Sequence, residues 1–138
     1  MIVFITGANR GIGLYQTKHF LADGDTVIAT YRDEAEAAEL FALQKEHEDR
    51  CHTVQGDITA DADVEGFKTF AEGLVPAIDI LVNNAGIDIE QTNPGIEEVG
   101  IDLLEHVFSV NTLGTVRVCK ALLPLIRKST QPTRGLIA

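Results

Sequence analysis

The stretch TGANRGIG, Thr6 to Gly13, lies between an apolar run and a segment with helical spacing. The apolar run, Ile2 to Thr6, is typical of a strand, and the segment from Ile12 to Ala22 is typical of a helix. A glycine-rich turn between a strand and a helix places backbone N–H groups and the positive end of the helix dipole around one point. Because glycines also mark ordinary tight turns, the loop predicts a phosphate site only in the right fold.

The rest of the chain supplies that fold. Further apolar runs bounded by turn residues are typical of strands, at Thr26 to Thr30, Cys51 to Gly56, Ile78 to Asn84 and the final GLIA. Helical spacing recurs between them, at Glu34 to His47, Ala62 to Glu72 and Leu103 to Lys128. This alternation predicts βαβ units and an α/β fold, a doubly wound parallel sheet with helices on both faces.

Local signals predict two helix starts and a long loop. Asp33 with Glu36, and Asp102 with Glu105, have the spacing of a capping box. The stretch from Ile87 to Gly100 contains an Asn-Pro-Gly turn and is expected to be a functional loop at the carboxyl end of a strand.

Length and composition predict one domain that spans residues 1–138. Of the 138 residues, 45% are hydrophobic and 23% are charged, enough for a core and too apolar for disorder. No apolar run is long enough to span a membrane, and no secretory signal follows Met1, so the expected location is the cytoplasm. The formal charge of −10 argues against a nucleic-acid partner, and an anionic cofactor would have to be held by a few placed cations.

The cysteines and histidines predict no disulfide and no metal site. Cys51 and Cys119 are far apart and have no CxxC partner, so two reduced thiols are expected. The four histidines have no paired spacing and are expected to be surface or core residues.

Three more motifs follow the glycine loop. Asp57 stands in GDIT after the third strand, Asn83-Asn84-Ala85-Gly86 follows the fourth, and Asn111 stands in VNTLG within the long helix. With the TGxxxGxG spacing of the loop, their order resembles the short-chain dehydrogenase/reductase family. The resemblance covers essentially the whole chain but corresponds to the N-terminal part of a family member. It implies a Rossmann-type sheet that is incomplete at its C-terminal end and stops within the fifth strand.

The resemblance implies a cofactor role for the glycine loop. The residues expected to approach the pyrophosphate of a dinucleotide are Gly7, Gly11, the backbone of Ile12, and Gly13. Asn9 and Arg10 are expected to line the adenosine side.

The later motifs also receive roles from the resemblance. Asp57 and Ile58 would flank the adenine, and Asn84, Ala85 and Gly86 would pack along the ribose. Asn111 would be the catalytic-site asparagine that holds a proton-relay water. Each motif has a plain alternative, because a turn aspartate, a strand-end turn and a core amide would account for them one by one.

The end of the second strand distinguishes between the two dinucleotides. An acid there binds the ribose 2′-OH of NAD, whereas an arginine accommodates the extra phosphate of NADP. By alignment with the family, Tyr31 occupies the acidic position and Arg32 follows it, while Arg10 is a second cation nearby. Asp33 is a competing NAD-selecting carboxylate, but helix capping gives it a structural role. The sequence predicts NADP in preference to NAD.

The catalytic signature of the family is absent from this chain. The resemblance implies hydride transfer between the nicotinamide and a carbonyl or alcohol carbon, with a serine and a Tyr-x-x-x-Lys pair whose ammonium lowers the phenol pKa. The chain's tyrosines are Tyr15 and Tyr31, and neither has a lysine four residues later. The serines, Ser109 and Ser129, lie in or near the long helix and not after a fifth strand.

The long helix from Leu103 to Lys128 carries too many apolar residues for one buried stripe. It therefore predicts a homo-oligomer or pairing with another protein through this helix. Pro124 is expected to bend the helix or mark its final turns.

Three functions remain open from the sequence. The first is the cofactor-binding part of an NADP-dependent enzyme that acts on a small-molecule carbonyl or alcohol. The second is a non-catalytic NADP-binding module that senses NADPH or pairs with another chain. The third, a flavodoxin-like phosphate-binding domain, would leave the three later motifs as coincidence.

Overall fold

The structure, a computed structural model, describes residues 1–88, 97–131 and 135–137. Its centre is a five-stranded, all-parallel sheet in the order β3-β2-β1-β4-β5. The strands are β1 (Ile2–Ile5), β2 (Thr26–Tyr31), β3 (Cys51–Gln55), β4 (Ile80–Val82) and β5 (Gly135–Ile137). The chain builds outward from β1 to β3 and then returns to the other side of β1. Parallel sheets bind ligands where the strand order reverses, at the carboxyl ends of the strands, which here means beside β1 and β4.

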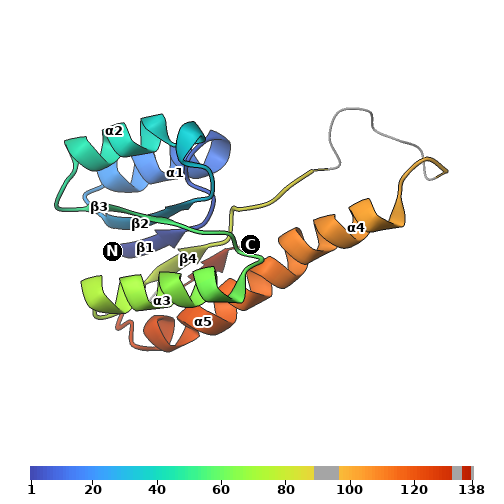
Figure 1. Ribbon diagram of the computed structural model, residues 1–138. Coiled ribbons are helices and arrows are strands. Elements are labelled where there is room, and N and C mark those ends of the chain that lie inside the picture. Colours follow the sequence, from blue (N-terminus) through green and yellow to red (C-terminus); the bar gives the residue numbers. More distant parts are fainter. Residues whose placement is uncertain (89–96, 132–134, 138) are drawn as a thin grey trace.

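Helices cover both faces of this sheet, as the sequence predicts (Figure 1). One face carries α1 (Gly11–Ala22), the short turn η1 (Glu34–Glu36) and α2 (Ala38–Glu46). The other face carries α3 (Asp61–Leu74) and α5 (Thr115–Arg127). The doubly wound α/β prediction is therefore confirmed.

The two faces bury different residues of the same strands, because successive side chains of a strand point to opposite sides. Phe4 and Ile28 belong to the core under α3 and α5. Their neighbours Val3, Ile5 and Val27 belong to the core under α1 and α2. Both central strands are thus apolar on both sides, which is why they appear in the sequence as continuous apolar runs.

The predicted long helix is continuous but changes its winding. It begins as α4 (Ile101–Phe108), widens into the π-helical segment η2 (Ser109–Gly114) and continues as α5. Pro124 lies in the last turns of α5, as predicted. A π-helical turn inside an α-helix shifts the side chains around it and is frequent at functional sites. Nothing in the sequence pattern signals this change.

One predicted capping box is half formed and the other is wrong. The Asp33 carboxylate caps η1 by accepting the N–H of Ala35 at 2.9 Å, but Glu36 contacts Arg10 with its carboxylate instead of completing a box. The predicted helix from Glu34 is therefore split into η1 and α2. α4 begins after Gly100 with no side-chain cap, so Asp102 lies inside the helix and caps nothing.

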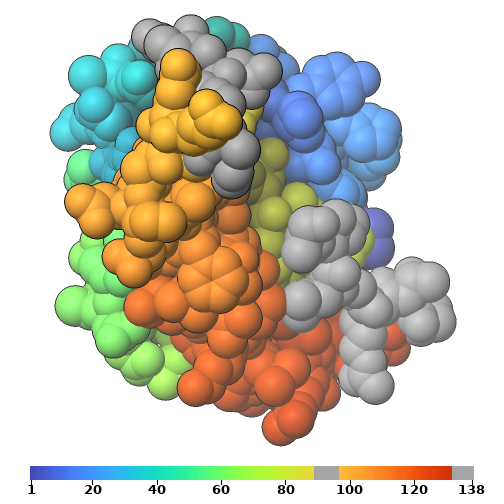
Figure 2. Space-filling model, turned by 90° about the vertical axis from the view of Figure 1, so that its right-hand side faces the viewer, coloured from blue at the N-terminus to red at the C-terminus, as the bar shows by residue number. Residues whose placement is uncertain are grey.

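The long helix leaves apolar side chains uncovered by the described residues. Its α4 part buries none of its residues, and the most exposed apolar side chains are Ile101 (67%), Phe108 (55%) and Val116 (48%). Figure 2 shows this helix, in orange, along the centre of one face. Within the described residues, no helix is both long and apolar enough to cross a membrane.

Two predicted features fall partly outside the described residues. Of the predicted loop from Ile87 to Gly100, residues 89–96 are not described, and these include Asn93, Pro94 and Gly95. Ala138, the last residue of GLIA, is also outside the described part.

The core under α3 predicts a strong effect of Phe67→Ala. Phe67 is fully buried, and its ring lies 6.1 Å from that of Phe4. Removing it should lower the free energy of unfolding by about 3–5 kcal/mol, measured by urea denaturation. Phe70→Ala is the matched control on the same helix, because Phe70 is 36% exposed and should cost clearly less. Equal losses in the two variants would contradict this packing.

Candidate functional site

The loops after β1 and β4 are joined by the side chain of Thr6. Its buried hydroxyl accepts the backbone N–H groups of Asn84 (3.1 Å) and Ala85 (3.0 Å). The amide of Asn84 returns the contact by donating to the carbonyl oxygens of Thr6 (3.0 Å) and Gly7 (2.8 Å). These bonds fix the glycine loop relative to the loop that follows β4.

Two glycines are required by this close approach. At Gly7, where φ is +63°, an added Cβ would lie 2.9 Å from the Cα of Ala85. At Gly13, an added Cβ would lie 2.4 Å from both the Asn84 amide nitrogen and the Gly7 carbonyl oxygen. Gly11 differs, because its φ of +54° requires glycine while the space beside it is open.

Thr30, at the end of β2, supports the glycine loop from the other side. Its hydroxyl accepts the Gly7 N–H at 3.2 Å, and its carbonyl accepts the Ala8 N–H at 2.7 Å. The sequence prediction missed Thr30, although the parallel pairing of β1 with β2 places it beside the loop.

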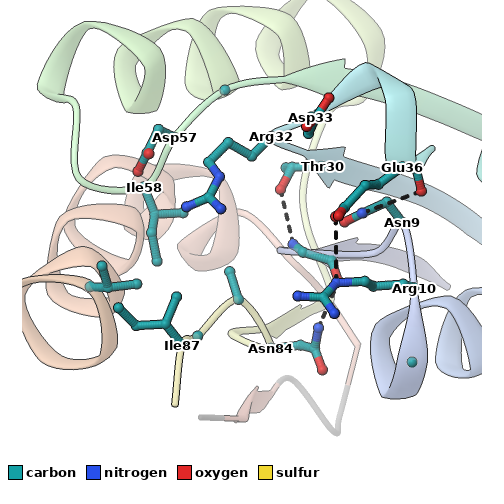
Figure 3. A pocket seen from close by; sticks show the side chains of 16 residues that line it. Asn9, Arg10, Thr30, Arg32, Asp33, Glu36, Asp57, Ile58, Asn84 and Ile87 are labelled. Atoms are coloured by element: carbon teal, nitrogen blue, oxygen red, sulfur yellow. Dashed lines mark hydrogen bonds and ion pairs between the residues drawn. The ribbon is translucent and has the colours of Figure 1, made fainter. Parts of the chain in front are cut away.

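A cavity of about 260 Å³ lies over the carboxyl ends of β1, β2, β3 and β4 (Figure 3). Its lining includes ten of the residues predicted to bind cofactor: Gly7, Asn9, Arg10, Gly11, Arg32, Asp57, Ile58, Asn84, Ala85 and Gly86. Six more lining residues were not predicted as binding residues: Thr30, Asp33, Glu36, Gly56, Ile87 and Val110. Most of the latter follow strand ends or adjoin a motif, so the parallel topology could have indicated them.

Ile12, Gly13 and Asn111 do not line the cavity. Ile12 is 72% exposed on the first turn of α1, and Gly13 is buried behind the loop. Asn111 lies in η2, where its side chain forms a two-way bridge to the backbone of Ile87, accepting the N–H at 2.9 Å and donating to the carbonyl at 2.8 Å. Asn111 therefore ties the helix to the loop after β4.

The charged groups of the cavity gather at its β2 and β3 end. Arg10 forms an ion pair with Glu36 at 3.6 Å, while the exposed Arg32 guanidinium has no ion pair among the described residues. The carboxylate of Asp33 is held by the N–H of Ala35. Figure 3 shows Arg10 and Arg32 reaching into the cavity from two different loops.

Asp57 is kept ionised by its surroundings. Burial by itself raises the pKa of its carboxyl, but two hydrogen bonds from Thr59 and the positive charges of Arg32 and His106 together outweigh that effect, and the pKa is lowered. Asp57 therefore stays an acceptor at neutral pH, with one oxygen occupied by Thr59.

The cavity lining contains no tyrosine, lysine or serine within the described part of the chain. Tyr15 is 72% exposed on α1, and Tyr31 packs edge-on against Phe41 with ring centroids 5.1 Å apart. Lys18 pairs with Glu39 at 3.0 Å and not with Tyr15. The described residues also contain no group of His, Cys, Asp and Glu placed to hold a metal ion.

A sequence profile described as short chain dehydrogenase matches residues 1–137, nearly the whole chain. The chain belongs to the short-chain dehydrogenase family. The family assignment makes it a relative of oxidoreductases and accounts for the order of the glycine loop, Asp57, the Asn-Asn-Ala-Gly stretch and Asn111.

Curated members of the short-chain dehydrogenase family align along most of this chain. It is 32% identical to (+)-neomenthol dehydrogenase of Arabidopsis thaliana, over 93% of this chain and 50% of the relative. It is 35% identical to chlorophyll(ide) b reductase NOL of Oryza sativa subsp. japonica, over 98% of this chain and 39% of the relative. The chain thus spans about half or less of these relatives.

Solved structures of the family superpose well on this fold. Carbonyl reductase Sniffer of D. melanogaster matches with a TM-score of 0.88 and 29% identity, over 98% of this chain and 58% of that one. The NADPH-bound carbonyl reductase from chicken fatty liver matches with a TM-score of 0.87 and 30% identity, over 97% and 51%.

The Thr6 contacts predict that Thr6→Val destabilises the short-chain dehydrogenase fold. The change keeps the shape but leaves two partly buried N–H groups without their acceptor, at a cost of about 1–3 kcal/mol in the free energy of unfolding. Thr6→Ser keeps the hydroxyl and is the control in the same denaturation experiment. Equal stability of the valine and serine variants would show that the hydroxyl does not hold the two loops.

The close approach at Gly13 predicts that Gly13→Ala disrupts the loop contacts. The methyl group would displace the Asn84 amide, so amide NMR signals of Asn84 and Ala85 should shift and the protein should unfold at lower urea concentration. Gly73→Ala in α3 is the control, because nothing lies within 4 Å of its added Cβ, and alanine there should stabilise the helix by up to about 1 kcal/mol. A Gly13→Ala variant as stable as the wild type would contradict the geometry.

Proposed function

We propose that this chain is the NADP-binding part of a short-chain dehydrogenase that transfers hydride between the nicotinamide and a small-molecule carbonyl or alcohol. The observation that carries the proposal is the cavity at the strand ends, which is lined by a glycine loop that includes Arg10 and by Arg32 after β2. The NADPH-bound carbonyl reductase from chicken, which matches over most of this chain, supports the same cofactor.

The glycine loop fits a pyrophosphate. Gly7 and Gly13 hold the loop against Asn84 and Ala85, and the open space beside Gly11 lets a ligand approach the backbone where α1 begins. The first turn of α1 presents free N–H groups and the positive end of the helix dipole, both of which favour an anion. In a chain of charge −10, this local arrangement is what would attract the cofactor.

The β2 end of the cavity fits the 2′-phosphate of NADP better than a free ribose hydroxyl. Arg32 has no ion pair among the described residues, and the ion pair of Arg10 is long and exposed. Both guanidiniums are therefore available to bind an anion. One oxygen of the Asp33 carboxylate, the group expected to bind the 2′-OH of NAD, is held in capping η1. Asp57 and Ile58 lie at the same end and would flank the adenine.

The bound cofactor would supply the hydride chemistry, and the described residues would orient it. Asn84, Ala85 and Gly86 would pack along the ribose, and Asn111 would fix the loop beside the reacting end through Ile87. Asn111 is proposed as the catalytic-site asparagine, since a second hydrogen of its amide and a second lone pair of its oxygen are left for a water. The Ser and Tyr-x-x-x-Lys elements would have to come from outside this chain.

A second candidate function is favoured by the uncovered apolar face of the long helix. Phe108, Leu113 and Val116 are each at least 40% exposed in the described part of the chain. Contiguous apolar surface is typical of an interaction site. A non-catalytic NADP-binding module that pairs with a second copy or another subunit would use this face.

A hydride-transfer assay combined with dilution of the protein separates the two candidates. The purified chain is mixed with NADPH and a panel of aldehydes and ketones, and loss of NADPH absorbance is recorded. Turnover would show that the chain is catalytic and would exclude the inert module. NADPH binding without turnover is expected of both candidates, because this chain lacks the Tyr-x-x-x-Lys pair. In that case, a dimer that loses NADPH binding on dilution would favour the module, and an absence of binding would overturn both.

The position of Arg32 predicts that removing its side chain weakens the binding of NADPH but not that of NADH. Arg32→Ala should weaken NADPH binding about tenfold or more, because a charge-assisted contact to the phosphate is lost, and should leave NADH binding nearly unchanged. Fluorescence titration of both cofactors measures this. Arg127→Ala removes the same charge at the end of α5, away from the cavity, and is the control. Equal NADPH affinity of wild type and Arg32→Ala would contradict the NADP assignment.

A further inference from the structure

The glycine loop and η1 are connected by two neighbouring residues. The Arg10 guanidinium lies 3.6 Å from the Glu36 carboxylate, and the Asn9 side-chain amide contacts the Glu36 backbone carbonyl at 3.5 Å. Asn9, Arg10 and Glu36 all line the cavity (Figure 3). A carboxylate therefore stands beside one of the two cations that the proposed function gives to the 2′-phosphate.

Among the described residues, the ion pair with Arg10 is the polar contact of the Glu36 carboxylate. Its carboxylate is 56% exposed and contacts Arg10 alone among the described residues, while its backbone N–H and carbonyl make the contacts that hold η1 in place. Exposed pairs of this length contribute little to stability. The sequence prediction treated Glu36 only as half of a capping box, and the structure does not form that box.

A carboxylate beside Arg10 acts on the two dinucleotides differently. To bind the Arg10 guanidinium, the 2′-phosphate of NADP must displace the Glu36 carboxylate or share the guanidinium with it. NAD has an uncharged hydroxyl at that place. The pyrophosphate is common to both cofactors, so its interaction with the glycine loop cancels in the ratio of their affinities. Glu36 therefore affects the ratio.

We propose that Glu36 is a selectivity residue, whose carboxylate competes with the cofactor 2′-phosphate for the Arg10 guanidinium and so reduces the preference for NADP over NAD. This inference rests on the proposed NADP-binding function. It assigns opposite effects to the charges of one cavity: Arg32 and Arg10 favour NADP, and Glu36 limits how strongly they do so.

The test is fluorescence titration of the 138-residue chain with NADPH and NADH. Glu36→Gln keeps the size of the side chain and the backbone contacts but removes the charge. It should tighten NADPH binding about three- to tenfold and leave NADH binding unchanged. The gain should shrink in about 1 M salt, where the Debye length falls to about 3 Å.

Two controls test whether the gain in NADPH affinity comes from the pair of Glu36 and Arg10. Glu34→Gln makes the same charge change on η1 at an exposed residue that does not line the cavity, and should change NADPH binding much less. In the Arg10→Ala background, Glu36→Gln should lose most of its effect, because the guanidinium for which the two anions compete is gone.

The outcomes are distinct. Weaker or unchanged NADPH binding in Glu36→Gln would overturn the inference, and so would an equal gain for both cofactors or an equal gain from Glu34→Gln. If the wild-type chain folds and binds neither cofactor, the proposed function itself fails and the inference falls with it. If it binds only NADH, and Glu36→Gln does not restore NADPH binding, the selectivity role is refuted while dinucleotide binding stands.

Discussion

The site depends on the hydroxyl of Thr6, a single buried oxygen that accepts two backbone N–H groups from the loop after β4. These bonds, with the return contacts from the Asn84 amide, bring together the two loops that flank the point where the strand order reverses. The approach is so close that Gly7 and Gly13 have no room for a side chain. The glycine spacing of TGANRGIG is therefore explained by packing between the two loops as well as by space for a ligand.

The electrostatics of the cavity are local, because the chain as a whole would repel an anion. With a formal charge of −10, attraction for a phosphate must come from the first turn of α1 and from Arg10 and Arg32. Three acidic residues also line the cavity, and the carboxylate of each has a different partner. Asp33 caps η1, Asp57 is held by Thr59, and Glu36 is paired with Arg10.

Much of the fold was predictable, since apolar runs and helical spacing locate all five strands and the main helices. The two-sided core follows from parallel βαβ units. The strand order β3-β2-β1-β4-β5 does not, because other doubly wound sheets have a different order. What the sequence could not give were features that depend on tertiary contacts. The widening of the helix at Asn111, the break between η1 and α2, and the pairing of Glu36 with Arg10 depend on neighbours distant in sequence. The second capping box failed because Asp102 entered α4 instead of preceding it. Thr30 was missed because its neighbour is the glycine loop, which only the sheet brings near.

The most direct test of the account is amide NMR of the purified chain during titration with NADPH, after size-exclusion chromatography confirms a folded species. The account predicts one-to-one saturation in the micromolar range, with the largest shifts at the glycine loop, the end of β2 and the loop after β3. A folded chain whose spectrum does not change, or changes mainly along the exposed face of α4 and α5, would contradict the claim that the strand-end cavity binds the dinucleotide.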